Sequence, residues 1–496
     1  MLLRKRFTFA PVARTVALGT AALIAGPYAS TADAIPTGKV IERVRCRDYP
    51  GQTYALYVPS SYNTSRTWPV LYAFDPLARG DVPVRLFSQA AERLGFVVAA
   101  SNNSRNGPLP PILTAMQAVW ADTHLRLALD PVRVYATGMS GGTLPARLLA
   151  LDQGVGIIAC AGALDPSELP KGGRRLDWLG VAGDADFNFS LTKSVVEAMV
   201  ERGAVARFAS FEGGHAWPPE PLAARAMEWL ELGAMRVGHR PRDAALIDAL
   251  YEQGLARARE LLAKGRWDDA AAENAALARE FAGLKPVEAL VAEAKRLRDT
   301  PEAKRDRKRE ARLAERDSSE TRQLVALRTR IERAAGGNPV EDLRPFDPSA
   351  QAVPEAVDLW SLQRQVDNRI ARFTRELEST DPDARIVARR ILDGFYISTF
   401  FAGGERRRDR RFDAAVADFE ICAKMRPKTA SPVYEKARTY AARGDRKAAL
   451  GALKAAIALG FGDANRLVED PEWSQLRDDP EYRAVSQTLG SRLAVP

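Results

Sequence analysis

The chain has 496 residues, of which 46% are hydrophobic and 27% are charged. This composition is typical of globular proteins and excludes global disorder, and the length predicts two or three domains. The net charge of +9 is modest for this length, and acidic and basic residues are interleaved, which disfavours nucleic-acid binding. The cysteines and histidines show no metal-ligand spacing, so we expect no metal and no other cofactor.

Residues 1–34 have the features of a secretory signal peptide. An apolar run fills positions 16–25, and small residues surround Ala34, after which we expect cleavage. Four basic residues come before the apolar run: Arg4, Lys5, Arg6 and Arg14. The run is shorter than the roughly 20 residues that span a bilayer, which disfavours an uncleaved anchor, and no later stretch is long enough. We therefore expect a secreted or periplasmic protein without a membrane span.

Between about residues 40 and 235, short apolar runs rich in β-branched residues alternate with longer amphipathic stretches. This alternation predicts helices layered on a mostly parallel sheet. The predicted strands are 40–44, 54–58, 70–74, 96–100, 132–137, 156–161, 178–182 and 205–211. The predicted helices are 84–94, 112–127, 143–151, 191–201 and 222–232.

Beyond residue 240 the composition changes to Ala, Arg, Glu and Leu with helical periodicity, so we place the end of the α/β domain there, over residues 35–240. Residues 241–335 are expected to form a helical segment with one degenerate repeat-like unit and a charged helix. Four prolines between positions 336 and 355 predict a linker. Residues 356–496 are expected to form a second, all-α domain.

A pattern of buried-type residues repeats after 34 residues in the last part of the chain. The two sets are Ala415, Phe419, Cys422 and Ala449, Leu453, Ala456. This spacing resembles that of tetratricopeptide repeats, in which small residues let two helices approach and larger ones fill the seam. The resemblance implies a docking surface for a protein partner, or self-association.

Two smaller features each leave two interpretations open. Five arginines cluster in residues 406–411, which we interpret as an exposed basic turn, with a site for an anionic partner as the alternative. Cys160 lies in an apolar run and is expected to be a buried structural thiol, although an oxidising compartment would permit a disulfide with Cys46.

The chemistry is indicated by the sequence Gly-Met-Ser-Gly-Gly at residues 138–142. It follows a predicted strand and precedes a predicted helix, which is the context of the G-x-S-x-G nucleophile elbow. The sharp turn holds the serine in a strained conformation, so small neighbours are needed. Ser140 is therefore the candidate nucleophile, and the N–H of Gly141 is the expected first donor to the oxyanion.

The partners of a nucleophilic serine follow in the order acid and then histidine, as this type of elbow requires. Asp184 and Asp186 come after the predicted strand 178–182, and His215 comes after the predicted strand 205–211. His124 lies inside a predicted helix and His239 lies between domains, so His215 is the candidate base. Either aspartate is close enough along the chain to be the acid.

Residues 132–149, 183–186 and 213–218 resemble the secreted esterase group that includes polyhydroxybutyrate depolymerases and feruloyl esterases. The resemblance covers roughly residues 40–235 and implies an α/β-hydrolase fold and a small-molecule or polymer ester as substrate. These families place the acid three residues after a glycine, which here selects Asp186 and leaves Asp184 as a loop residue. Their histidine stands in a glycine-rich loop followed by Trp-Pro, as His215 does.

The loop after the predicted strand 70–74 departs from this pattern. Related enzymes usually have His-Gly there, whereas this chain has Asp75-Pro76-Leu77, and a proline has no N–H to donate. We expect Leu77 to supply the second oxyanion donor. The polar run 101–106 could line the same face, or be an ordinary polar loop.

These observations favour an exported serine hydrolase that cleaves carboxylic esters through an acyl-enzyme and carries a helical interaction module. A serine peptidase on the same fold is one alternative, although its relatives usually have a large domain before the hydrolase, for which there is no room. A non-catalytic scaffold with a degenerate hydrolase domain is the other. The complete Ser-Asp-His order argues against a scaffold, and the missing His-Gly argues for it.

Overall fold

The computed structural model describes residues 35–153, 156–162, 176–334 and 359–493. The expected signal peptide, residues 1–34, and the expected linker, residues 336–355, lie outside these ranges. The chain divides into two compact units, one up to Glu310 and one from Ala311 onward, and each unit is described by itself.

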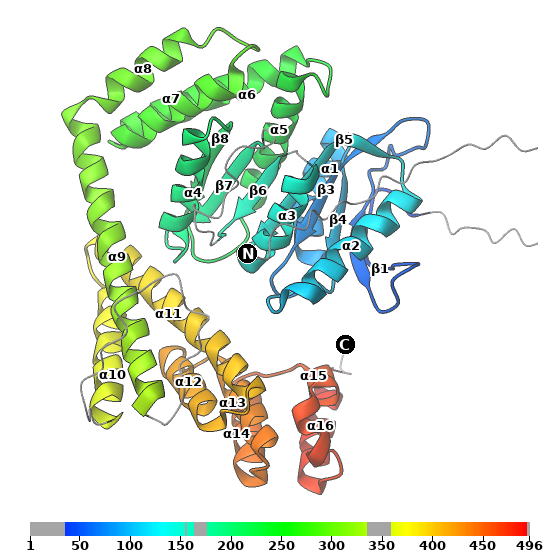
Figure 1. The fold of residues 1–496 in the computed structure, drawn as a ribbon, viewed down its shortest axis with the longest axis vertical. Helices are drawn as coiled ribbons and strands as arrows, with labels where there is room; N and C mark the ends of the chain where they lie inside the picture. Colours follow the sequence, from blue (N-terminus) through cyan, green and yellow to red (C-terminus); the bar gives the residue numbers. More distant parts are fainter. Residues whose placement is uncertain (1–34, 154–155, 163–175, 335–358, 494–496) are drawn as a thin grey trace, which may run out of the picture. The chain divides into compact units, whose positions relative to one another are not determined.

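The first unit is built on an eight-stranded sheet with the order β1-β2-β4-β3-β5-β6-β7-β8 (Figure 1). β1 and β2 pair antiparallel with their neighbours, and the strands from β4 to β8 are parallel. The strands are β1 (Val40–Arg45), β2 (Thr53–Tyr57), β3 (Trp68–Phe74), β4 (Val97–Ser101), β5 (Leu129–Met139), β6 (Ile157–Cys160), β7 (Trp178–Gly183) and β8 (Ala206–Phe211). All eight predicted strands are thus present, each with slightly shifted ends.

Helices cover both faces of this sheet. The helices are α1 (Asp81–Leu94), α2 (Leu109–Arg126), α3 (Thr143–Gln153), α4 (Phe189–Glu201) and α5 (Glu220–Val237). Buried side chains of α2, α3 and α4 share one hydrophobic core with the sheet, and those of α1 and α5 share a second core with it. This three-layer arrangement and the strand order are those of the α/β-hydrolase fold.

Three helices that follow residue 240 complete the first unit. They are α6 (Ala244–Ala263), α7 (Trp267–Phe281) and α8 (Glu288–Arg298). Arg207 of β8 pairs with Glu273 at 2.9 Å and with Glu280 at 2.6 Å, both on α7. Apolar residues of α5, α6 and α7 form a common cluster. The change of composition near residue 240 therefore marks a change of secondary structure, while the compact unit continues to Glu310 because α7 is ion-paired to β8.

All the secondary-structure elements among the described residues of the second unit are helices. Its elements are the later part of α9 (Pro301–Ala334), then α10 (Leu359–Glu376), α11 (Pro382–Arg408), α12 (Phe412–Met425), α13 (Ala430–Arg443), α14 (Arg446–Ala458), α15 (Ala464–Glu469), the short 3-10 helix η4 (Pro471–Leu476) and α16 (Pro480–Leu493). α11 packs on α12, and α13 packs on α14. All six residues of the 34-residue pattern are fully buried, three on α12 and three on α14.

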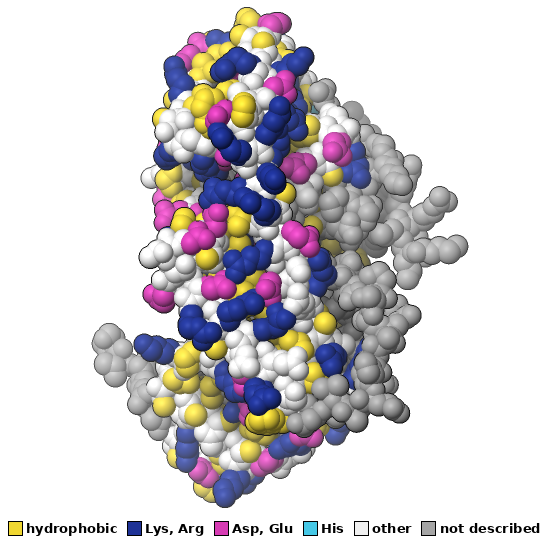
Figure 2. Space-filling model, turned by 90° about the vertical axis from the view of Figure 1, so that its left-hand side faces the viewer, with side chains coloured by type: hydrophobic (Ala, Val, Ile, Leu, Met, Phe, Trp, Pro, Cys, Tyr) yellow, Lys and Arg dark blue, Asp and Glu magenta, His cyan; other side chains and the backbone are white. Residues whose placement is uncertain are grey.

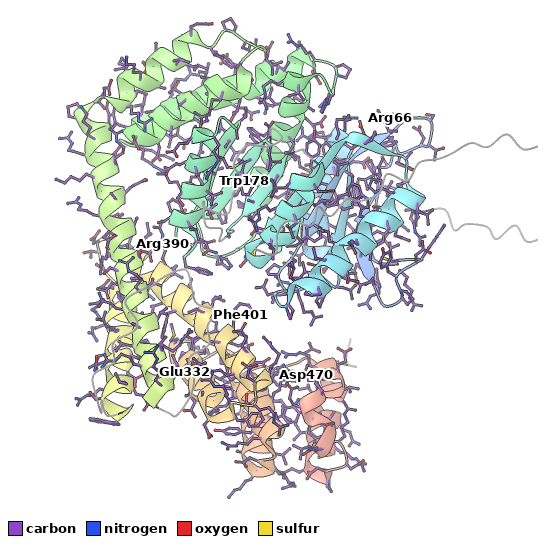
Figure 3. All side chains as sticks on the ribbon, in the orientation of Figure 1. Arg66, Trp178, Glu332, Arg390, Phe401 and Asp470 are labelled. Atoms are coloured by element: carbon purple, nitrogen blue, oxygen red, sulfur yellow. The ribbon has the colours of Figure 1, made fainter. Side chains whose placement is uncertain are left out.

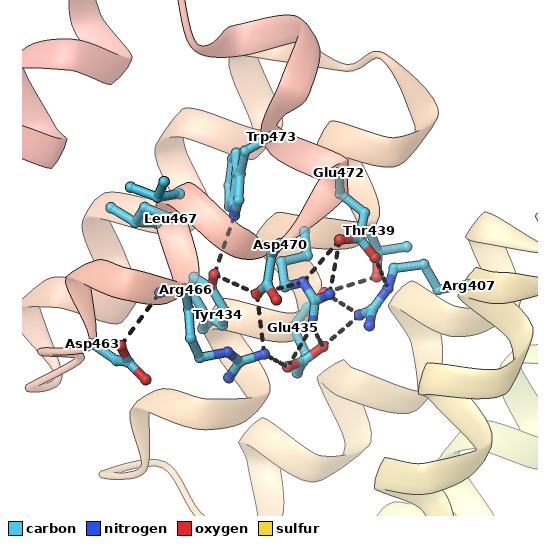
Figure 4. A network of polar contacts seen from close by, with 12 residues as sticks. Arg407, Tyr434, Glu435, Thr439, Asp463, Arg466, Leu467, Asp470, Glu472 and Trp473 are labelled. Carbon is cyan, nitrogen blue, oxygen red and sulfur yellow. Dashed lines mark hydrogen bonds and ion pairs between the residues drawn. The ribbon is translucent and has the colours of Figure 1, made fainter. Parts of the chain in front are cut away.

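The arginine cluster at the end of α11 is not simply an exposed basic turn. Arg406 and Arg407 are only 3% and 9% exposed. Arg406 pairs with Glu332 and Asp418. Arg407 pairs with Glu435 and, at 3.0 Å, with Glu472 (Figure 4). The interpretation as an exposed turn is therefore wrong for these two residues, because acidic partners far along the chain pair with them inside the helical core.

Two surface properties of the described residues bear on possible partners. On the face that Figure 2 shows, Lys and Arg side chains lie among Asp and Glu side chains, as the interleaving in the sequence suggested. None of the described helices is both long and apolar enough to cross a lipid bilayer.

Candidate active site

Ser140 lies at the sharp turn between β5, which ends at Met139, and α3, which begins at Thr143. Its φ angle is +53°, in the left-handed region that non-glycine residues seldom adopt and that costs on the order of 1 kcal/mol or more. The Thr143 hydroxyl donates a 2.6 Å hydrogen bond to the Ser140 carbonyl oxygen and so closes the turn. This strain has the form expected of a nucleophile elbow.

Glycines surround the turn because no larger residue fits. A Cβ atom on Gly138 would lie 2.0 Å from the carbonyl oxygen of Gly142. A Cβ atom on Gly142 would in turn lie 2.0 Å from the carbonyl oxygen of Phe74, at the end of β3. Real Cβ atoms do not approach backbone oxygens so closely, so both glycines are required for β3, β5 and the turn to pack together.

His215 and Asp186 are in direct contact, although they come from different loops. The Nδ1 atom of His215 lies 3.0 Å and 3.1 Å from the two carboxylate oxygens of Asp186. Asp186 is fully buried, and the backbone N–H of Asn188 donates to its Oδ1 at 2.7 Å. The ring of Phe187 packs against the imidazole at a centroid distance of 4.2 Å. The carboxylate can thus hold the imidazole with a proton on Nδ1 and leave Nε2 available as a base.

Asp184 has a different partner. Its Oδ1 accepts a 3.0 Å hydrogen bond from the backbone N–H of Gly213, in the loop that carries His215. Asp184 therefore joins the loops after β7 and β8 through the backbone, while the imidazole contact is made by Asp186.

Ser140, Asp186 and His215 follow β5, β7 and β8, and these strands are parallel, so all three residues lie at the same edge of the sheet. In the part of the chain that the structure describes, no hydrogen bond joins the Ser140 hydroxyl to His215. Such bonds are often long in unliganded enzymes and tighten when substrate binds. This edge of the sheet thus carries the three groups that acyl transfer uses, which are a hydroxyl, a carboxylate and an imidazole.

The other histidines have structural environments. The His124 ring packs against Trp120 at a centroid distance of 4.0 Å, and its Nδ1 lies 2.9 Å from the Trp120 carbonyl oxygen. Burial lowers the pKa of His124, which favours a neutral ring. His239 lies just beyond α5, where its N–H donates to the Ala234 carbonyl oxygen. Neither histidine lies in a loop that directly follows a strand, as Ser140, Asp186 and His215 do.

The expected second oxyanion donor, Leu77, is engaged in its own loop. Its N–H donates a 2.9 Å hydrogen bond to Asp75 Oδ1, and the residue is 57% exposed. In this conformation the Leu77 amide does not face Ser140 as a free donor. Gly141, the expected first donor, lies in the turn itself, directly after Ser140.

Asp75 is a residue of the site whose role the sequence did not indicate. It is fully buried, and its carboxylate accepts from the indole nitrogen of Trp217 at 3.0 Å and from the guanidinium of Arg79 at 3.1 Å. Trp217 stands two residues after His215. Because positions 75 and 217 are far apart in the chain, no local pattern relates them, and only the folded sheet brings them together.

A cavity of about 340 Å³ lies beside Ser140. Its lining combines the apolar side chains of Ile112, Leu144, Trp178 and Val195 with Arg147. Trp178 begins β7 (Figure 3), and its buried indole N–H has no hydrogen-bond partner among the described residues. The cavity is large enough for a small organic group attached to the reacting carbonyl.

The three cysteines are buried free thiols, so the possible Cys46–Cys160 disulfide is not formed in this structure. Burial raises the pKa of Cys160 to about 12 and that of Cys46 to about 11, which disfavours a reactive thiolate at either position. Within the described ranges, no cluster of three or more His, Cys, Asp or Glu residues is arranged to hold a metal ion.

The chain matches no protein-family model and no curated protein. Similar solved structures include a ferulic acid esterase, 16% identical over 39% of this chain and 96% of its own, with a TM-score of 0.33. A fluorophosphonate-binding serine hydrolase of Staphylococcus aureus is 13% identical over 39% of this chain and 99% of its own, with a TM-score of 0.34. A butyrate-bound esterase of Thermogutta terrifontis is 16% identical over 42% and 97%, with a TM-score of 0.33. At such low identity, a function has to be argued from the site itself.

Proposed function

We propose that this chain is a serine hydrolase that cleaves carboxylic esters through an acyl-enzyme. The observation that carries the proposal is the contact between buried Asp186 and His215, at the sheet edge where Ser140 occupies a left-handed turn. A buried aspartate on the imidazole and a strained serine are what nucleophilic catalysis needs, and neither is required for a stable core.

In the proposed reaction, Nε2 of His215 takes the proton from the Ser140 hydroxyl as its oxygen attacks the ester carbonyl. The carbonyl π electrons move onto oxygen, and the tetrahedral intermediate then expels the alcohol, which takes the proton from His215. Water, deprotonated by His215, then attacks the acyl-enzyme carbonyl; the bond to the Ser140 oxygen breaks, the carboxylic acid leaves, and His215 returns its proton to Ser140. Asp186 stabilises the imidazolium that forms in each half of the reaction.

The mostly apolar cavity beside Ser140 favours an ester with a hydrophobic acyl or alcohol group, either a small molecule or the end of a polymer chain.

One observation favours the second candidate function, a non-catalytic scaffold. The Leu77 N–H is hydrogen-bonded to the Asp75 carboxylate, so the loop after β3 does not offer this N–H to an oxyanion.

A fluorophosphonate probe separates the two functions, because an activated serine displaces fluoride from phosphorus and keeps the probe. We expect wild-type protein to be labelled on Ser140, and we expect Ser140→Ala and His215→Ala to lose labelling. Hydrolysis of p-nitrophenyl butyrate should disappear in the same variants. Equally weak labelling of wild type and Ser140→Ala would favour the scaffold.

We also propose that the protein is exported and that the helical repeats of the second unit bind a protein partner or a second copy. The basic and apolar start of the chain and the buried 34-residue pattern support these two points. N-terminal sequencing of the protein from its source cells would test export, since a mature chain beginning near Ile35 is expected. Sedimentation of the purified protein would test self-association.

A further inference from the structure

The loop after β3, residues 76–80, offers no free backbone N–H for an oxyanion. Pro76 has none, and the amides of Leu77 and Ala78 both donate to Asp75, to its side chain and its carbonyl oxygen. The Arg79 amide faces the Asp75 carboxylate at 3.4 Å, and the Gly80 amide donates to the Asn102 side chain at 3.2 Å. A second oxyanion donor therefore has to come from another element.

The loop after β4 brings Asn106 to this place. The Asn106 N–H donates a 2.9 Å hydrogen bond to the Pro76 carbonyl oxygen, and Arg105 forms a bridge with Leu77. The loop after β4 thus lies side by side with the loop after β3. Its position is fixed by backbone hydrogen bonds, so the side chain of Asn106 is left free to act.

That side chain lies against the nucleophile turn. A Cβ atom on Gly141 would lie 1.8 Å from Oδ1 and 3.1 Å from Nδ2 of Asn106, so the amide occupies the space that any side chain at position 141 would need. Asn106, Ser140 and Gly141 line the same cavity. Among the described residues, the amide of Asn106 has no hydrogen-bond partner, and rotation about its last bond exchanges oxygen and nitrogen at nearly the same place.

We propose that the side-chain amide of Asn106 is the second donor of the oxyanion hole. The inference rests on the proposed esterase function. When Ser140 attacks, negative charge develops on the former carbonyl oxygen, and the Gly141 N–H and the Asn106 Nδ2–H donate to it together. Donors that strengthen as charge develops lower the barrier without tightening substrate binding to the same degree.

The test is the steady-state hydrolysis of p-nitrophenyl acetate by the full chain with Asn106→Ala. Removal of one oxyanion donor typically lowers kcat about 10²–10³-fold, and we expect that loss with KM little changed. Asn106→Asp, which keeps the shape but has no N–H, should lose at least as much. The thermal midpoint of Asn106→Ala should stay near that of wild type, because its amide makes no hydrogen bond to other described residues.

Asn102→Ala is the matched control, because Asn102 lies in the same loop and has a structural role. Its amide accepts from Gly80 and donates to the Glu42 carbonyl oxygen at 3.0 Å. We expect this variant to lower the thermal midpoint and to keep most of kcat. An equal loss of kcat in both variants, or an unchanged kcat in Asn106→Ala, would overturn the proposal. Failure of wild type to react with fluorophosphonate would instead overturn the esterase function itself.

Discussion

Two fully buried carboxylates, Asp186 and Asp75, contact side chains of the loop that carries His215. Asp186 contacts the imidazole of His215, and Asp75 accepts from the indole of Trp217, two residues further along. Each carboxylate also accepts backbone N–H groups in its own loop, which fixes its orientation. At the scale of single residues, the position of the His215 loop is thus set by side chains from the loops after both β3 and β7.

The two candidate acids differ in what an asparagine would do at each position. In Asp186→Asn the new NH₂ group donates to Nδ1 of His215, which places the imidazole proton on Nε2. Nε2 can then no longer accept the Ser140 proton, so we expect kcat to fall about 10³–10⁴-fold. Asp184→Asn keeps the oxygen that accepts from Gly213, so activity should change little. Hydrolysis of p-nitrophenyl butyrate measures both. A larger loss at Asp184 would assign the acid to Asp184.

At the scale of elements, buried ion pairs join helices of the second unit. Glu435 on α13 pairs with Arg407 of α11, Arg438 of α13 and Arg466 of α15 (Figure 4). Burial alone would raise the pKa of Glu435, but the three guanidinium groups outweigh burial and lower the pKa to about 2. The charged carboxylate of Glu435 therefore pairs with arginines on three helices.

This lowered pKa predicts how the stability of α13 depends on pH. Because the folded pKa is below the ordinary value, the stabilisation is complete above about pH 4.5 and is lost as the pH falls toward 2. We expect Glu435→Gln to speed amide hydrogen exchange of α13 at pH 7, where it removes a charged partner shared by three arginines, and to have a smaller effect near pH 3, where part of this stabilisation is already lost in wild type.

Glu481→Gln is the control for this measurement, because Glu481 is an acid of the same unit whose pairs with Arg446 and Lys454 are largely exposed. Exposed ion pairs contribute little, so this variant should behave like wild type at both pH values. A difference between Glu435→Gln and wild type that is the same at pH 7 and pH 3 would contradict the prediction.

At the scale of the whole molecule, the first compact unit extends to Glu310 and includes α6, α7 and α8. The change of composition near residue 240 had placed these helices in a separate helical segment. α7 supplies the buried carboxylates of Glu273 and Glu280 to the partly buried Arg207 of β8, and it shares an apolar cluster with α5. An edge strand that loses the partners of a partly buried arginine, next to a helix whose apolar face becomes exposed, is prone to aggregate.

Two truncations test this division. A chain ending at residue 240 should be largely insoluble, because it loses both partners of Arg207 and exposes Leu232 and Met235 of α5. A chain ending at Glu310 should remain soluble and keep fluorophosphonate labelling. Soluble yield and labelling measure the outcome. Full labelling of the shorter chain would show that α6 to α8 are dispensable for the sheet.

The sequence by itself determined the features that depend on neighbouring residues. The eight strands could be predicted because apolar runs and turns are local patterns, and Ser140 because glycines must surround a strained turn. The order of Ser140, Asp186 and His215 at strand ends could be predicted for the same reason. The resemblance to secreted esterases selected Asp186 from two neighbouring aspartates.

Only the tertiary structure decided the features that join distant segments. Asp75 meets Trp217 across 142 positions, and Arg207 meets Glu280 across 73. Such contacts have no local pattern, because the two partners come from elements that are far apart in the chain, although a buried charge is costly unless it is paired. The same reason explains why Arg406 and Arg407, at the end of α11, lie inside the helical core.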